Sequence, residues 1–179
     1  MNESRHVIAF AASSSRTSIN KHLVTYAAGL LEHATVEILD LNDFELPLFS
    51  VDREAELGQP ELARKFYDII GESDGVIISF AEHNGNYSAA YKNLFDWVSR
   101  IDPKVYQNKA MVLLATSPGG RGGKGVLEIA LNSIPRFNGV IKSSLSLPSF
   151  NDYFDTVEGK IVDDEINARV CDAVNRLFD

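Results

Sequence analysis

The sequence predicts a three-layer α/β fold built on a parallel sheet. Along its 179 residues, β-branched apolar runs alternate with amphipathic segments at regular spacing. The runs GVIISFA (75–81) and MVLLA (111–115) are almost continuously apolar, which is typical of strands buried on both faces by helices. With 45% hydrophobic and 23% charged residues the composition is that of a globular protein, and we expect residues 1–179 to form a single domain.

The pattern repeats a strand and a helix five times. We expect strands at residues 6–12, 35–41, 74–81, 109–117 and 140–148. We expect the helices at residues 19–33, 60–72, 87–100, 124–136 and 163–178. The least regular segments are 42–59 and 148–160, which we interpret as candidate lids or partner contacts.

Composition and charge exclude several classes of protein. Seventeen Lys and Arg against 25 Asp and Glu give a net charge of -8, which disfavours a general nucleic-acid binder. No apolar run approaches the roughly 20 residues of a membrane span. The start MNESRHVIAF lacks the features of a secretory signal and Cys171 has no internal partner, so we expect a cytoplasmic protein. His6, His22 and His33 have no metal-ligand spacing with the cysteine, and we expect no metal site.

Three of the expected strands end in unusual polar loops. These are SSSRTSIN (13–20), AEHNGNY (81–87) and TSPGGRGGKG (116–125). In open parallel sheets, ligands bind beyond the carboxyl ends of the strands, where the strand order reverses. If the order is 2-1-3-4-5, the first, third and fourth strands are neighbours and the three loops converge on one crevice.

The first loop has the chemistry of an anion site. Free N–H groups and the positive dipole end of the next helix favour a phosphate monoester, and the hydroxyl groups add donors. The alternative is that Ser18 or Thr17 only caps the helix. The dinucleotide fingerprint G-x-G-x-x-G is absent, so we interpret Asp40 as a helix-facing or loop acid.

The second loop suits a planar ring. Asn84-Gly85 is a turn signal whose glycine lets a ligand approach the backbone, and neighbouring amides suit the edge of a heterocycle. A Glu82–His83 acid–base pair is the less favoured alternative, because no serine or cysteine nucleophile accompanies it.

The third loop exposes backbone N–H groups in GGRGG (119–123), with Arg121 at its tip. The spacing of a nucleotide-triphosphate loop fails, because Pro118 stands where a glycine is required and Gly125 follows Lys124. A flexible connector is the alternative interpretation of this loop.

The segment AEHNGNYSAAYKNLFDW (81–97) resembles the P-E-Y-N-G-S-x-x-x-x-L-K-N-x-x-D-W segment of the NAD(P)H-dependent FMN reductases, flavodoxin-like proteins that include quinone, azo-dye and chromate reductases. The resemblance extends from His6 to about Leu147. It departs from the family pattern at Ala81 and His83, where Pro and Tyr are usual, and the first loop lacks the opening glycine. Trp97 is interpreted as a core or dimer-interface residue.

The resemblance implies a flavodoxin-like three-layer sandwich of order 2-1-3-4-5 that binds FMN. Hydride would pass from NADPH, or NADH, through FMN to a quinone, free flavin or similar small acceptor, with no catalytic side chain. Arg121 and Lys124 favour NADPH. The resemblance also implies a homodimer or homotetramer. The alternative function is that of an electron-transfer flavodoxin without nicotinamide oxidase activity. Carried over by position, the phosphate contacts are Ser13, Ser15, Arg16, Ser18, Ile19 and Asn20, and the ring contacts are Glu82, His83, Asn84, Gly85, Ser117, Pro118, Gly119 and Gly120.

Overall fold

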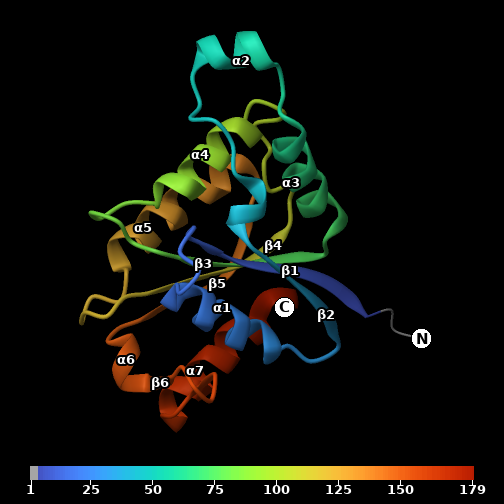
Figure 1. The fold of residues 1–179 in the computed structure, drawn as a ribbon. Coiled ribbons are helices and arrows are strands. Elements are labelled where there is room, and N and C mark those ends of the chain that lie inside the picture. The colour runs from blue at the N-terminus through green and yellow to red at the C-terminus, as the bar shows by residue number, and fades with distance from the viewer. Residues whose placement is uncertain (1–3) are drawn as a thin grey trace.

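The computed structural model describes residues 4–179 and contains a five-stranded sheet in the order β2-β1-β3-β4-β5 (Figure 1). All neighbouring strands of this sheet are parallel. The predicted three-layer, flavodoxin-like fold and its strand order are confirmed. The strands are β1 (Arg5–Ala12), β2 (Ala34–Leu39), β3 (Gly75–Phe80), β4 (Ala110–Thr116) and β5 (Val140–Leu147).

Helices cover both faces of the sheet. Side chains of β1 alternate between two cores: Val7 and Ala9 pack with the residues of α1 (Ile19–Gly29) and α7 (Asp164–Asn175), whereas Ile8 and Phe10 face the opposite layer. That opposite layer consists of α3 (Glu61–Glu72), α4 (Ala89–Val98) and α5 (Lys124–Ser133).

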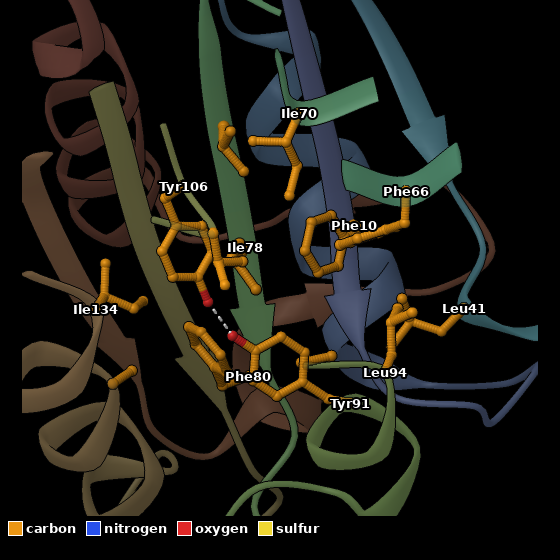
Figure 2. Packing of buried hydrophobic residues seen from close by; sticks show 14 of the residues in the cluster. Phe10, Leu41, Phe66, Ile70, Ile78, Phe80, Tyr91, Leu94, Tyr106 and Ile134 are labelled. Atoms are coloured by element: carbon orange, nitrogen blue, oxygen red, sulfur yellow. Dashed lines mark hydrogen bonds between the residues drawn. The ribbon is translucent and has the colours of Figure 1, made fainter. Parts of the chain in front are cut away.

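The core beneath α3, α4 and α5 is rich in aromatic rings (Figure 2). Phe10 of β1 meets Phe66 of α3 edge to face, with ring centroids 5.4 Å apart. The hydroxyl groups of Tyr91 and Tyr106 hydrogen-bond to each other, and burial raises the pKa of both phenols. Trp97 is fully buried and its Nε1 donates to the Pro47 carbonyl at 2.7 Å, which confirms the core interpretation.

Several helices are shorter than the periodicity predicts. The helix expected at 19–33 ends at Gly29, and His33, just before β2, has a positive φ of 60° that no helix tolerates. The helix expected at 124–136 ends at Ser133 and continues as the 3-10 helix η2 (Ile134–Phe137), because Pro135 lacks the N–H that an α-helix needs. The last predicted helix similarly ends in the 3-10 helix η3 (Arg176–Phe178).

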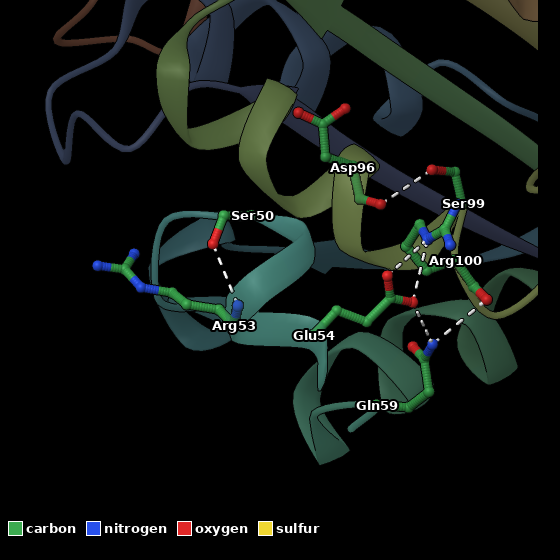
Figure 3. Close-up of polar contacts among 7 residues, drawn as sticks. All are labelled: Ser50, Arg53, Glu54, Gln59, Asp96, Ser99 and Arg100. Atoms are coloured by element: carbon green, nitrogen blue, oxygen red, sulfur yellow. Dashed lines mark hydrogen bonds and ion pairs between the residues drawn. The ribbon is translucent and has the colours of Figure 1, made fainter. Parts of the chain in front are cut away.

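The segment expected to be irregular, 42–59, contains the helix α2 (Val51–Leu57), which follows the 3-10 helix η1 (Leu41–Phe44). Figure 3 shows what holds α2: the Ser50 hydroxyl accepts from the Arg53 N–H at 3.1 Å, and both Glu54 carboxylate oxygens lie 3.0 Å from Arg100 Nε. No residue of α2 is buried. A capping residue and a distant arginine therefore support this helix, in place of core packing.

The second irregular segment, 148–160, folds back along α1. It contains α6 (Phe150–Tyr153), and β6 (Phe154–Asp155) pairs antiparallel with β7 (Lys160–Ile161). None of the helices within residues 4–179 has the length and apolar character needed to cross a membrane.

Asp40 is a loop acid, as interpreted from the sequence. Its carboxylate accepts from Lys21 Nζ at 2.6 Å and from the Asn42 N–H at 2.9 Å, and these bonds lower its pKa from 3.8 to about 2.

A carboxyl with a lowered pKa stabilises the fold above its unfolded pKa and loses that contribution as the pH falls through the folded value. We expect Asp40→Asn to be less stable than the wild type at about pH 5, with the difference shrinking below about pH 4 and lost below about pH 2. Urea unfolding across this range measures it, and a constant difference would contradict the assignment.

Candidate functional site

The three polar loops leave the sheet side by side. In the strand register Ala12 pairs with Phe80, and Phe80 pairs with Ala115, so the carboxyl ends of β1, β3 and β4 are level. The strand order reverses between β1 and β3. The three loops therefore leave one edge of the sheet side by side, as expected, where open parallel sheets bind their ligands; that they enclose one crevice stays a prediction.

The first loop leaves backbone donors free at the start of α1. Ser13 is buried, and its hydroxyl accepts from the Ser15 N–H at 3.2 Å. Ser18 stands at the N-cap position, but its side chain makes no capping bond, and the first turn carries no acidic residue. Within residues 4–179 no protein acceptor receives the N–H groups of four loop and helix residues: Arg16, Thr17, Ile19 and Asn20. These donors and the exposed Ser15 hydroxyl are available to an anion.

Asn20 turns into the protein. Its Oδ1 accepts from the Ser79 hydroxyl at 2.8 Å and from the Thr116 N–H at 3.1 Å, while its Nδ2 donates to the Thr116 carbonyl at 3.2 Å. All three residues are buried. The Asn20 side chain thus ties the start of α1 to β3 and β4, and only its N–H is left to face a ligand.

The second loop is a tight turn that projects into open space. His83 and Asn86 exchange two backbone hydrogen bonds, of 2.9 and 3.1 Å. The two central residues have positive φ, 52° at Asn84 and 77° at Gly85, as a type I′ turn requires. A Cβ at Gly85 would meet nothing within 4 Å. The backbone of this turn is open to the close approach of a flat ligand.

Glu82 holds the third loop in place. Its Oε2 accepts from the Val126 N–H at 2.8 Å, in the first turn of α5, and lies 2.8 Å from where a Cβ would stand on Gly125. The carboxylate therefore serves as a cap from a distant strand end and sits at the positive end of the α5 dipole. This capping bond explains the position of the Glu82 carboxylate without a proton-transfer role and without the expected ring contact.

We expect Glu82→Ala to lower the free energy of unfolding by about 1 kcal/mol, the usual cost of a lost N-terminal cap. Glu82→Gln should lose less, because its amide oxygen still accepts from Val126 N–H. Glu128→Ala, at an exposed position on the same helix, is the matched control. Urea unfolding of the three variants without ligand measures the effect, and equal losses for Ala and Gln would argue against the cap.

The third loop is anchored through two of its backbone carbonyls. The Ser149 N–H donates to the Gly119 carbonyl at 3.0 Å, and the Ser146 hydroxyl donates to the Gly122 carbonyl at 2.9 Å. A Cβ on Gly122, where φ is 57°, would lie 2.5 Å from Ser146 Oγ, so only glycine fits. By contrast, a Cβ on Gly119 or Gly120 would meet nothing within 4 Å. The loop is no loose connector: one half is fixed, and the other half is open to a ligand.

Two residues of the segment that resembles the reductase motif act structurally. Asn93 Oδ1 accepts from the Phe49 N–H at 2.8 Å, and Asn93 Nδ2 donates to the Leu46 carbonyl at 3.0 Å. Together with Trp97 on Pro47, this amide fastens residues 46–49 beside α4. Asn93 and Trp97 therefore act indirectly: they fix residues 46–49, which lie beside the candidate site.

Two cavities flank the first loop, and the sequence did not predict either. One, of about 410 Å³, lies on the α4 side; the other, of about 510 Å³, lies along the outer side of α1. Arg16 and Ser18 line the α1 cavity. The cavity on the α4 side is lined by Ser14, Leu41, Asn42, Phe44, Glu45, Leu46, Leu48, Ala89, Ala90 and Asn93. The sequence hinted at the cavity on the α4 side only through the irregular composition of residues 42–59, the segment that supplies one of its walls.

A parallel sheet of order 2-1-3-4-5 with three ligand-accessible loops at its switch point defines a flavodoxin-like α/β protein. Within this class, the chain belongs to the NADPH-dependent FMN reductase family, whose model matches residues 5–151.

Similar proteins with assigned names include quinone reductases. A 2-hydroxy-1,4-benzoquinone reductase from a Burkholderia species is 33% identical over 109 residues, which cover 60% of this chain and 57% of that protein. A quinone reductase from Escherichia coli strain K12 is 27% identical over 124 residues, which cover 69% of this chain and 65% of that protein. The chain thus spans less than two thirds of the length of these relatives.

Solved structures confirm the fold. A flavoenzyme NAD(P)H:(acceptor) oxidoreductase from Paracoccus denitrificans superposes with a TM-score of 0.79 at 22% identity, covering 97% of this chain and 94% of that one. An NAD(P)H:quinone oxidoreductase from Methanothermobacter marburgensis gives a TM-score of 0.65 at 22% identity, covering 98% and 97% of the two chains.

Proposed function

We propose that this protein binds FMN at its three polar loops and catalyses the oxidation of a nicotinamide coenzyme by a quinone, free flavin or similar small acceptor. The observation that carries the proposal is the convergence of unbonded backbone donors and open glycines at the switch point of a reductase-family sheet. The names of the curated relatives favour a quinone as acceptor.

The residues present fit FMN. The phosphate suits the N–H groups at the start of α1 with the hydroxyls of Ser15 and Ser18, and no acidic side chain in the first helical turn opposes it. A planar ring suits the exposed turn at Asn84 and Gly85, where a Cβ on Gly85 would meet nothing within 4 Å. When bound, FMN supplies the hydride chemistry, accepting a hydride from the nicotinamide and passing it to the acceptor.

The chain contributes positioning and electrostatics. Gly119 and Gly120 present N–H groups that form no bond within residues 4–179, and these suit an electron-rich ring edge. Ser117 and Pro118 precede them on the same loop. Arg121 and Lys124 are exposed, and their charges steer an anionic coenzyme toward the three-loop site, which favours NADPH. No side chain is required as a general acid or base.

Absorbance and turnover test the proposal. The purified protein should bind FMN and oxidise NAD(P)H with benzoquinone faster than an equal concentration of free FMN does. A protein that ignores added FMN, or that gives no excess rate, would refute the assignment. Stopped-flow mixing of the FMN-loaded protein with NADPH separates a reductase, which reduces its flavin, from an electron-transfer flavodoxin, which does not.

We also propose that the protein forms a homodimer or homotetramer. Leu48, Val51 and Leu57 in and beside α2 are 70%, 72% and 53% exposed, which is unusual for large apolar side chains so close together in the chain. Light scattering should give a mass at least twice 19.8 kDa at micromolar concentration, and a particle of 19.8 kDa would refute this. The cytoplasmic location stays a prediction.

A further inference from the structure

A groove runs along the outer side of α1, outside the three-loop site. Its volume of about 510 Å³ is in the range of small-molecule sites. One wall is the outward face of α1, and the other is the β6–β7 hairpin, which belongs to the second of the two irregular segments. It is lined by Arg16, Ser18, Lys21, His22, Thr25, Tyr26, Gly29, Leu30, Phe154 and Gly159.

The inner part of the groove is built from flat rings. Phe154 stacks on Phe150 with centroids 4.8 Å apart, while His22 and Tyr26 each lie 5.8 Å from Phe154. At Gly29 a Cβ would meet nothing within 4 Å, so the helix leaves open space beside these rings. Phe150 and Phe154 are buried, so His22 and Tyr26, which are partly exposed, are the rings that a planar aromatic group can contact.

The part of the groove nearest the first loop is positively charged. Arg16 is exposed and makes no ion pair within residues 4–179, whereas Lys21 is balanced by Asp40 at 2.6 Å. Arg16 therefore supplies an uncompensated charge in a chain whose net charge is -8. A phosphate matches this unpaired guanidinium.

We propose that the α1 groove binds the adenosine phosphate half of the nicotinamide coenzyme, with the adenine against His22 and Tyr26 and a phosphate against Arg16. This inference rests on the proposed function, because the nicotinamide coenzyme is a substrate of the proposed reaction. Arg16 and Ser18 line the groove and belong to the first loop, so one end of the groove lies beside the three-loop site.

Binding of coenzyme fragments to the FMN-loaded protein tests the groove directly. By calorimetry, adenosine 2′,5′-bisphosphate should bind more tightly than adenosine, and inorganic phosphate should not displace it at equal concentration. Gly29→Trp should lower the affinity for adenosine 2′,5′-bisphosphate at least about tenfold, because the indole ring fills the groove. Thr25→Trp, at an exposed position of the same wall, is a second blocking variant in case the first does not fold.

Two further variants complete the experiment. Ala55→Trp adds the same ring to exposed α2, on the other side of the sheet, and should leave binding of the fragment intact (Figure 1). Arg16→Gln should remove most of the preference for adenosine 2′,5′-bisphosphate over adenosine, a loss of about tenfold or more for a charge-assisted contact.

The outcomes separate this inference from the proposed function. If wild type oxidises NADPH but Gly29→Trp and Thr25→Trp bind the fragment normally, the groove assignment is wrong and the reductase stands. The groove assignment is equally wrong if only Arg121→Gln with Lys124→Gln abolishes fragment binding. If the fragment binds and both blocking variants lose it while the protein shows no NADPH oxidation, the groove is confirmed and the proposed function fails.

Discussion

Ser15→Asp should lower the affinity for FMN by about tenfold to a hundredfold while leaving riboflavin affinity almost unchanged. Ser15 is exposed in the first loop, next to the unbonded N–H groups of Arg16 and Thr17. A carboxylate there removes a hydroxyl donor and repels a phosphate that carries nearly two charges. Riboflavin shares the ring but lacks the phosphate, so it reports on the ring contacts alone.

Titration of both flavins against wild type and Ser15→Asp measures the effect, with a melting curve to show that the variant is folded. If the loop were only a helix cap, aspartate near the N-terminus of α1 would be harmless or favourable, and neither flavin would be affected. Equal weakening of FMN and riboflavin, or no change in either, would mean that the hydroxyl cluster does not bind phosphate.

Asn20→Ala should lower the free energy of unfolding by roughly 2–5 kcal/mol, because it leaves several buried polar groups without partners. These are the Ser79 hydroxyl and both backbone groups of Thr116, each now bonded to the Asn20 amide. Urea unfolding without FMN measures the loss. The effect is large because one side chain connects α1, β3 and β4.

Ser18→Ala is the matched control, two residues earlier in the same loop. Ser18 is also buried but makes no capping bond, so its loss should cost no more than about 0.5 kcal/mol. Equal losses at the two positions would show that the Asn20 amide does not connect these elements.

The order of elements and their arrangement were predictable because they depend on local periodicity and on general rules of parallel sheets. The apolar run of β3 is buried on both faces, and this burial is what such a run predicts. The three polar loops were predictable as a site because β1, β3 and β4 must end at one edge once the order is 2-1-3-4-5.

Side-chain roles inside the loops were not predictable, because they depend on partners far away in the chain. Asn20 and Thr116 are 96 residues apart, and Glu82 caps a helix 44 residues further on. The Asn20 and Glu82 side chains bind the protein itself, where position in the motif had suggested ligand contacts.

The segments around the site show the same division. Residues 42–59 have no periodicity that predicts α2, yet Ser50 and the distant Arg100 support it. The groove on α1 exists because residues 148–161 fold back as a hairpin beside a helix face with a glycine at position 29. Local pattern thus determined which segments are helices, strands and polar loops, whereas the tertiary structure decided which side chains face a ligand, since only the folded chain brings distant donors and acceptors together.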